Sequence, residues 1–387
     1  MDICLKEKCT GCFACFNICK NNAITIKEDK EGFLFPIIDK SKCINCKKCF
    51  NVCPSNKNIE LKKPSQVWAV INNNMQEYIN SSSGGAFYVF AKEIINEGGK
   101  VYGACFNESL EVKHIRVETI DGLSKLRGSK YVQSQINDIY TKVKCDLEND
   151  TKVLFSGTPC QVAGLKNYLI KSYENLITID LICHGVPSQK IFDKYIEYIG
   201  KGRKITDFKF RHKMKNDTNP MILHYKKGGK NHNNKTALTD TFYYAFLNGY
   251  IYRQSCYNCM YATEKRVGDI TLGDFWGVEK HHVEFTHKNG VSAILINTKK
   301  GKTFYEKVKE DFVSVESNIN FVKEKNSNLN HPSQRKEYRN DIYKELNEKG
   351  YKYIANKYFK VENRSLLKLK SIIPMKYKEK IVCFLKK

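Results

Sequence analysis

Two sets of four cysteines near the start of the chain have the spacing of iron–sulfur ligands. The first set reads C-x2-C-x2-C-x3-C, and the second repeats this pattern 34 positions later. On a tight loop, three such thiolates reach irons of one cubane, whereas the fourth reaches the other cluster. We therefore expect two 4Fe–4S clusters with crossed ligation. The expected ligands are Cys9, Cys12, Cys15 and Cys53 for one cluster, and Cys43, Cys46, Cys49 and Cys19 for the other.

A pair of zinc sites is the alternative interpretation, because C-x2-C motifs also bind zinc. Eight cysteines in two identical quartets favour the clusters over zinc. Between the quartets, residues 23–27 and 33–38 alternate in hydrophobicity around Asp29–Gly32, which is typical of a β-hairpin. Residues 1–62 are therefore predicted to form an α+β, ferredoxin-like module with two 4Fe–4S clusters.

Four further cysteines could bind metal, and they are Cys160, Cys183, Cys256 and Cys259. Thr158 suits a helix N-cap and Pro159 the first helical position, so Cys160 is expected in the first turn of a helix. The free N–H groups and the helix dipole favour a thiolate there. Cys183 is expected at the end of the next parallel strand, on the same edge of the sheet, and the C-x2-C pair would supply two more thiolates. Ordinary buried thiols and a zinc claw remain alternatives to a third 4Fe–4S cluster on this spacing alone.

The elements that must position these residues alternate between strands and helices after residue 63. Strands are expected at 67–71, 101–106, 152–155 and 176–183, and helices at 85–96, 161–170 and from Pro187 to Ile199. Such alternation predicts a larger α/β domain over residues 63–315, with function at the strand ends. The cysteines outside these patterns are interpreted as ordinary thiols, and they are Cys4, Cys105, Cys145 and Cys383.

The composition fits a folded protein of the reducing cytoplasm. Hydrophobic residues make up 41% of the 387 positions, and no run of eighteen apolar residues predicts a transmembrane helix. The first residues contain Asp2, Glu7 and two cysteines where a signal peptide needs an apolar stretch. In the cytoplasm, sixteen cysteines are expected to bind metal or do redox chemistry instead of forming disulfides.

Positive charge is concentrated towards the end of the chain. The formal net charge is +24, and residues 331–387 hold sixteen Lys and Arg against six Asp and Glu. A basic surface favours anionic partners, although an AT-rich genome would give the same excess of lysine. We expect residues 316–387 to be a basic, partly helical extension. For Leu366–Leu385 we favour a solvated tail over membrane contact, because stable anchoring takes two signals. Nucleic acid is not predicted as a partner, since the basic residues are dispersed and no binding motif is present.

Five segments in fixed order resemble the coenzyme F-420 hydrogenase/dehydrogenase beta-subunit family. They are residues 82–85, 128–131, 156–161, 183–187 and 268–277, and the resemblance covers residues 1 to about 300. Members of that family bind FAD beside a 4Fe–4S cluster, and many carry an N-terminal two-cluster ferredoxin region. The resemblance therefore implies a flavin-binding α/β domain and a third cluster on the four cysteines named above. No G-x-G-x-x-G follows a strand here, so the sequence itself makes no case for a Rossmann flavin site.

The residues expected at the flavin are less strongly marked. The small residues Ser82, Ser83, Gly84 and Gly85 open a helix and could cradle a pyrophosphate, or simply form an empty N-cap loop. Ser129 and Lys130 could contact a phosphate or a flavin carbonyl, or Lys130 could be a solvated lysine. Trp276 could stack on a ring, although core packing explains it equally.

His184 and Lys130 are the catalytic candidates. His184 follows a candidate ligand, so it could relay a proton to flavin or substrate, or donate a hydrogen bond to a cluster sulfur. Clusters pass single electrons whereas organic substrates need two, so a flavin would convert between them. We expect an oxidoreductase that relays electrons between ferredoxin or another redox protein and a small molecule or deazaflavin-type cofactor. The alternatives are a non-catalytic electron-transfer subunit and a redox-sensing iron–sulfur protein.

Overall fold

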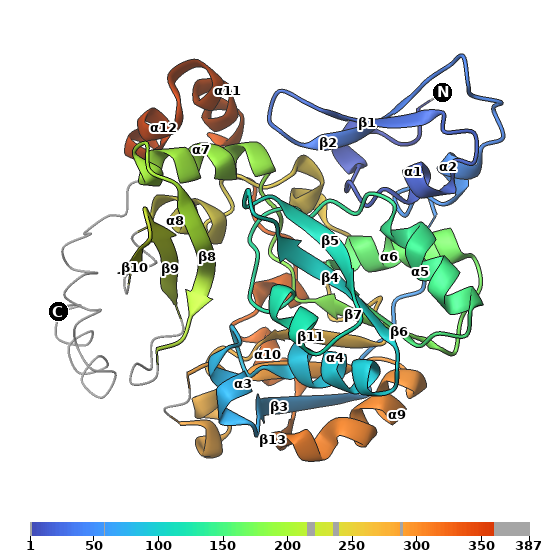
Figure 1. Cartoon of the computed structure of the whole chain (residues 1–387), viewed down its shortest axis with the longest axis vertical. Coiled ribbons are helices and arrows are strands. Elements are labelled where there is room, and N and C mark those ends of the chain that lie inside the picture. The colour runs from blue at the N-terminus through green and yellow to red at the C-terminus, as the bar shows by residue number, and fades with distance from the viewer. Residues whose placement is uncertain (1, 58, 215–220, 235–239, 287–288, 360–387) are drawn as a thin grey trace.

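The computed structural model describes residues 2–57, 59–214, 221–234, 240–286 and 289–359 (Figure 1). The predicted tail segment Leu366–Leu385 and Cys383 lie outside these residues. None of the helices in the described part of the chain combines the length and apolar composition needed to cross a bilayer.

The N-terminal module contains one β-hairpin and two short helices. Strands β1 (Ile24–Glu28) and β2 (Leu34–Ile38) pair antiparallel, as the sequence predicted. The carboxylate of Asp29 closes the turn between them, because it accepts hydrogen bonds from two backbone N–H groups of the loop. Helices α1 (Ala14–Ile18) and α2 (Lys48–Asn51) each begin two residues after the second cysteine of a quartet and contain the third, so they help to fix the two cysteine loops.

The larger part of the chain is built on an eight-stranded mixed sheet of order β13-β3-β12-β11-β7-β6-β4-β5. The four neighbouring strands β4, β6, β7 and β11 are parallel, whereas the outer strands pair antiparallel. The expected α/β architecture is therefore confirmed, with a sheet that is parallel only at its centre. The strands are β3 (Gln66–Asn72), β4 (Lys100–Phe106), β5 (Val112–Val117), β6 (Val153–Gly157), β7 (Leu176–Leu181), β11 (Ile270–Asp274), β12 (Ser292–Ile296) and β13 (Phe312–Ser317).

Helices cover both faces of this sheet (Figure 1). Helices α4 (Ala86–Asn96) and α9 (Lys299–Val308) share one apolar core with the strands. On the other face, α5 (Ile139–Glu148) and α6 (Pro159–Leu169) pack on β4 and β6 and also contact the N-terminal module. The short helices α3 (Met75–Ile79) and α10 (Ile319–Lys323) lie near β3.

A second, aromatic-rich core lies beside the main sheet. It joins a three-stranded antiparallel sheet to helices from distant parts of the chain. Its elements are α7 (Gln189–Gly200), β8 (Ile205–His212), β9 (Ile222–Lys227), β10 (Lys230–Asn234), α8 (Thr241–Leu247), α11 (Arg339–Lys349) and α12 (Tyr351–Lys357). Ile342 and Ile354 of the last two helices are fully buried here, so this part of the C-terminal extension belongs to the folded core. Strand β13 crosses position 315, where we placed a domain boundary.

A buried ion pair ties the central strands together. Asp180, at the end of β7, is fully buried and lies 3.3 Å from a guanidinium nitrogen of Arg266. Its second carboxylate oxygen accepts from the backbone N–H groups of Val267 and Gly268 at 3.1 and 3.0 Å. The pair therefore fixes the loop that leads into β11, and through it the strand-end position of Asp274.

Replacing Asp180 with alanine should destabilise the main sheet strongly. The change leaves Arg266 buried without its anion, and breaking a buried pair in this way costs about 3–5 kcal/mol. Denaturant unfolding followed by circular dichroism measures the loss. Glu148→Ala, which removes an exposed pair with Lys144 on α5, is the control and should leave the unfolding midpoint unchanged. A midpoint equally unaffected by Asp180→Ala would contradict this account.

Candidate iron–sulfur and cofactor site

The structure brings together the first set of expected cluster ligands. Cys9, Cys12, Cys15 and Cys53 are all buried and line one small cavity in the N-terminal module. Burial raises the pKa of Cys12 to about 12, so the thiolate form needs a compensating positive charge such as iron. The donor set and its geometry therefore fit the crossed ligation expected from the spacing.

Cys4, which we interpreted as an ordinary thiol, lies beside this set. Hydrogen bonds with Cys53 and Cys9 raise the pKa of Cys4. No spacing signal marks this contact, because Cys4 stands outside the repeated pattern.

The second set lies at the surface. Cys46 is exposed, whereas Cys19, Cys43 and Cys49 are half-buried. Burial raises the pKa of Cys49, and the nearby Cys19 and Cys46 raise it further. Cys19 therefore lies with the later quartet, as crossed ligation requires.

The third set gathers at the carboxyl ends of β6 and β7. Cys160 is the second residue of α6, and the N–H of Thr158 donates to the side chain of Gln161 at 3.0 Å, which caps this helix. Cys183 follows β7 by two residues, and Cys256 and Cys259 lie at a 3-10 turn over 254–258. Burial raises the pKa of Cys256 to about 12, and the neighbouring thiols Cys259 and Cys160 contribute. The other three thiols act on Cys183 in the same way, so the four cysteines are close enough to interact, and their ligation of a third cluster stays a prediction.

Among the described residues, no three or more His, Cys, Asp or Glu side chains are grouped to hold a single metal ion. In a cubane the irons and sulfides stand between the thiolates, so cluster ligands lie farther apart than the ligands of one ion. The finding on single ions therefore does not test a cluster.

A glycine allows the first and third sets to be neighbours. Gly164 lies on α6, one turn after Cys160, and an added Cβ there would lie 2.9 Å from Cys12 Cβ and 3.0 Å from its sulfur. Any side chain at this position would therefore push the N-terminal module away from the helix. The close approach leaves the first set beside the third.

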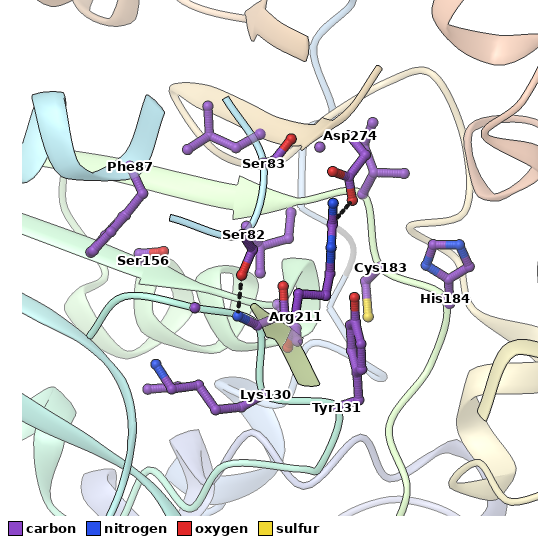
Figure 2. Close-up of a pocket in the computed structure, with 18 of the residues that line it drawn as sticks. Ser82, Ser83, Phe87, Lys130, Tyr131, Ser156, Cys183, His184, Arg211 and Asp274 are labelled. Carbon is purple, nitrogen blue, oxygen red and sulfur yellow. Dashed lines mark hydrogen bonds and ion pairs between the residues drawn. The ribbon is translucent and has the colours of Figure 1, made fainter. Parts of the chain in front are cut away.

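A cavity of about 500 Å³ opens next to the third set (Figure 2). Cys160 and Cys183 line it, and so do most of the residues expected at a cofactor. These are Ser82, Ser83, Gly85, Ser129, Lys130, His184 and Trp276. Gly84 is not among the lining residues: its added Cβ would meet the carbonyl oxygen of Val70 at 2.1 Å, so this glycine allows the loop to pack against β3.

Two loops of the cavity are joined by Ser82. Its hydroxyl accepts a hydrogen bond from the N–H of Ser129 at 2.8 Å (Figure 2). The ammonium of Lys130 donates to the backbone carbonyls of Leu126 and Arg127 at 2.9 and 2.7 Å. Burial lowers the pKa of Lys130 to about 7. Lys130 thus holds its own loop in place, and its contact with a cofactor or substrate stays a prediction.

Comparison with known families assigns the two parts of the chain. Residues 150–320 match the family model for the C terminus of the beta subunit of coenzyme F420 hydrogenase/dehydrogenase. This segment is therefore similar to that domain. Two models of 4Fe–4S dicluster domains match residues 8–57 and 35–86, and the first range contains all eight N-terminal cysteines. The resemblance found in the sequence is therefore confirmed, and with it the iron–sulfur character of the chain.

A solved structure of the F420-reducing NiFe hydrogenase complex from Methanosarcina barkeri contains a similar chain. The two share 16% identity with a TM-score of 0.46, over 70% of this chain and 91% of that one. No curated protein matches the sequence.

An ion pair between Arg211 and Asp274, which the sequence analysis missed, lies at one side of the cavity. Arg211 of β8 is buried and lies 2.5 Å from a carboxylate oxygen of Asp274, at the end of β11. Its guanidinium also lies 5.2 Å from the ring centre of Trp276. The Trp276 ring, which we expected at the cofactor, therefore lies within cation–π distance of Arg211. No spacing signal links Arg211 to Asp274, because the two are 63 positions apart.

His184 lies at the same side of the cavity (Figure 2). Burial lowers the pKa of His184, and the charge of Asp274 opposes that shift. Its ring is 6.1 Å from that of Phe246. The position suits both roles considered for it, proton transfer into the cavity and a hydrogen bond to a cluster sulfur.

A second missed residue, His114, lies at the cavity wall inside a hydrogen-bond network. Its Nε2 is 3.0 Å from the carbonyl oxygen of Ser156, so Nε2 carries the proton and Nδ1 accepts from Ser134, 2.9 Å away. Gln161 in turn donates to the Ser134 hydroxyl at 3.0 Å. The network connects the cap of α6 to the cavity and requires a neutral imidazole.

Because burial lowers the pKa of His114 to about 4, this residue should make folding pH-dependent. Unfolded histidine titrates near 6.5, so below that pH the unfolded chain binds a proton that the folded chain does not. Stability should therefore be lost as the pH falls from 6.5 towards 4, by about 2 kcal/mol at pH 5 from this group. Denaturant unfolding at pH 7 and pH 5 measures the loss. His114→Gln should show a smaller loss, and an identical loss would refute this account.

Proposed function

We propose that the protein is a cytoplasmic iron–sulfur flavoprotein oxidoreductase. It would carry three 4Fe–4S clusters and FAD, and act on an organic substrate or a deazaflavin-type cofactor. The main support is one observation: Cys160 and Cys183 line the same cavity of about 500 Å³ as the small-residue loop before α4. A cluster on the third set would therefore adjoin whatever this cavity binds.

The cavity fits a flavin in size, lining and charge. Its volume lies in the range of ligand pockets, about 300–1,000 Å³. Gly85, with a φ of +86°, turns the chain into the eleven-residue helix α4, and free N–H groups at such a helix start favour a pyrophosphate. Tyr131 stacks on Phe246 with ring centres 4.3 Å apart, and both line the cavity. These rings would exclude water from a bound isoalloxazine.

Bound clusters would supply one-electron transfer, and a bound flavin would pair two electrons as a hydride. The ligand sets form a series: the exposed set around Cys46, the buried set around Cys12, and the third set at the cavity. The close approach of Cys12 to Gly164 supports contact between the second and third members of this series. His184 is proposed to hold a proton at the cavity for the substrate.

The surface around the second set suits a small acidic electron carrier such as a ferredoxin. Cys46 is followed by the exposed Lys47 and Lys48, and Ile44 and Phe50 beside them expose 67% and 40% of their surface. Apolar contacts ringed by lysines favour an acidic partner with a complementary apolar patch.

Reduction of the protein by ferredoxin should therefore slow as the salt concentration rises. Salt screens the attraction between the lysines and an acidic carrier, so it weakens the electrostatic steering of their encounter. Stopped-flow mixing at increasing ionic strength measures the rate. Rates that do not depend on salt would contradict this partner class.

The decisive experiment is cofactor analysis after anaerobic purification. About twelve irons and one flavin per chain would support the proposal, whereas about eight irons without flavin would refute it. The Cys183→Ser variant removes a ligand of the third set only. It should therefore lose about four irons, those of one cluster, and its flavin should be reduced more slowly by dithionite. Cys145→Ser, at an exposed thiol of α5, is the matched control and should retain full iron content.

A non-catalytic electron-transfer subunit is the second candidate, supported by the same exposed cluster site. The isolated chain would then contain iron but turn over no deazaflavin or nicotinamide acceptor with an artificial donor. A stoichiometric partner that copurifies and restores turnover would favour this candidate. A redox sensor would lack turnover in either state.

A further inference from the structure

Arg253 is a buried arginine between two of the cysteine sets. It exposes 1% of its surface and lies three residues before Cys256. Its Nε donates to the carbonyl oxygen of Cys9 at 2.6 Å, and its Nη2 lies 3.5 Å from the Cys9 sulfur. Nη2 also donates to the carbonyl oxygen of Leu34 at 3.1 Å, and Nη1 donates to the side-chain oxygen of Gln133 at 3.2 Å.

Arg253 also lacks the carboxylate that other buried arginines have. Four arginines are buried in the described part of the chain. Arg211, Arg266 and Arg339 each lie within 4.0 Å of an Asp or Glu oxygen. Arg253 has no such partner among the described residues; its guanidinium is hydrogen-bonded to neutral groups and to the Cys9 sulfur.

A buried cation is costly unless an anion compensates it. The Cys9 sulfur, which the guanidinium contacts, can carry negative charge as a thiolate, and the other three cysteines of its set line the same cavity as Cys9. A 4Fe–4S cluster on four thiolates is a net anion, so it would supply the missing charge. The backbone of Arg253 is fixed at the third set, because its N–H donates to Val186 and its carbonyl accepts from Cys256, each at 2.9 Å.

We propose that Arg253 is the counter-ion of the cluster held by Cys9, Cys12, Cys15 and Cys53, and that it raises the reduction potential of this cluster. Reduction adds one electron, and so one negative charge, next to a fixed guanidinium. Arg253 is a positioning residue that acts through charge and an N–H···S hydrogen bond. The inference rests on the proposed ligation of this cluster and is independent of the flavin.

The other interpretation is that Arg253 only attaches the N-terminal module to the larger domain. Arg339 provides the matched control for that role. It is equally buried, contacts the same module through Glu31 and lies 5.9 Å from the ring centre of Phe33, to which Arg253 is also close. Within the described ranges Arg339 hydrogen-bonds to no cysteine, so it tests attachment without the electrostatic contact.

The test is an EPR-monitored redox titration of the anaerobic full-length protein with dithionite as the electron donor. The step of this cluster is assigned by its altered signal in Cys12→Ser. In Arg253→Met its reduction should become at least tenfold less favourable, which is 59 mV for a one-electron couple. Arg253→Lys keeps the positive charge but loses the several N–H donors of the guanidinium. The reduction potential of the cluster in this variant should therefore lie between those of Arg253→Met and the wild type. Arg339→Met should leave the step in place.

Iron and sulfide analysis shows whether the cluster is present, and so separates a failure of the counter-ion role from a failure of the ligation. Arg253→Met with full iron and an unmoved step would overturn the proposal, and so would an equal shift in Arg339→Met. A wild-type protein without the N-terminal iron would refute the ligation itself. If Arg253→Met does not fold, ENDOR on the wild type with ¹⁵N-guanidino arginine replaces it. A nitrogen coupling to the reduced cluster that disappears in Arg253→Lys is expected, and its absence in the wild type would overturn the proposal.

Discussion

The contact between the Cys9–Cys12 loop and the larger domain is the constraint on which the rest of the structure depends. Gly11, with a φ of +67°, and Gly164 on α6 remove the side chains that would separate the two parts. The guanidinium of Arg253 lies between the two parts and hydrogen-bonds to the carbonyl oxygen of Cys9 on one side and to the side chain of Gln133 on the other. The proposed relay of single electrons would need its centres close together and shielded from water, and this contact would provide both conditions.

The parallel centre of the sheet explains where the cavity lies. Strands β6, β7 and β11 run in one direction, so Cys160, Cys183 and Asp274 come to the same edge. The antiparallel strands β12 and β3 extend the sheet on one side and bring the loop of residues 81–85 to that edge. A mixed sheet thus collects ligands and a small-residue loop from segments far apart in the sequence. The third set of cysteines lies next to the cavity because β6, β7 and β11 run in the same direction.

Much of this architecture could be predicted from the sequence, because its signals are local. Cysteine spacing, the hairpin around Asp29 and the Thr158–Pro159 helix start each depend on a few neighbouring residues. The contacts of Arg253 with Cys9 and of Arg211 with Asp274 span 244 and 63 positions, and no periodicity marks them. The burial of His114 and the close packing at Gly164 likewise depend on which elements become neighbours. Helices α11 and α12 were expected only as part of an extension, because a charged, weakly patterned sequence conceals the few residues that pack.

The ion pair of Arg339 with Glu31 has a consequence for how the protein is made. Glu31 lies in the hairpin turn of the N-terminal module, whereas Arg339 begins α11, more than three hundred positions later. The partner of the hairpin turn is therefore synthesised long after the cysteines of the N-terminal module. Gly164 and Arg253, which pack on Cys12 and Cys9, also follow those cysteines at a great distance along the chain, so the contacts that bury this set form only after much of the larger domain has been synthesised. The order of residues along the chain thus sets the order in which the contacts of the N-terminal module can form.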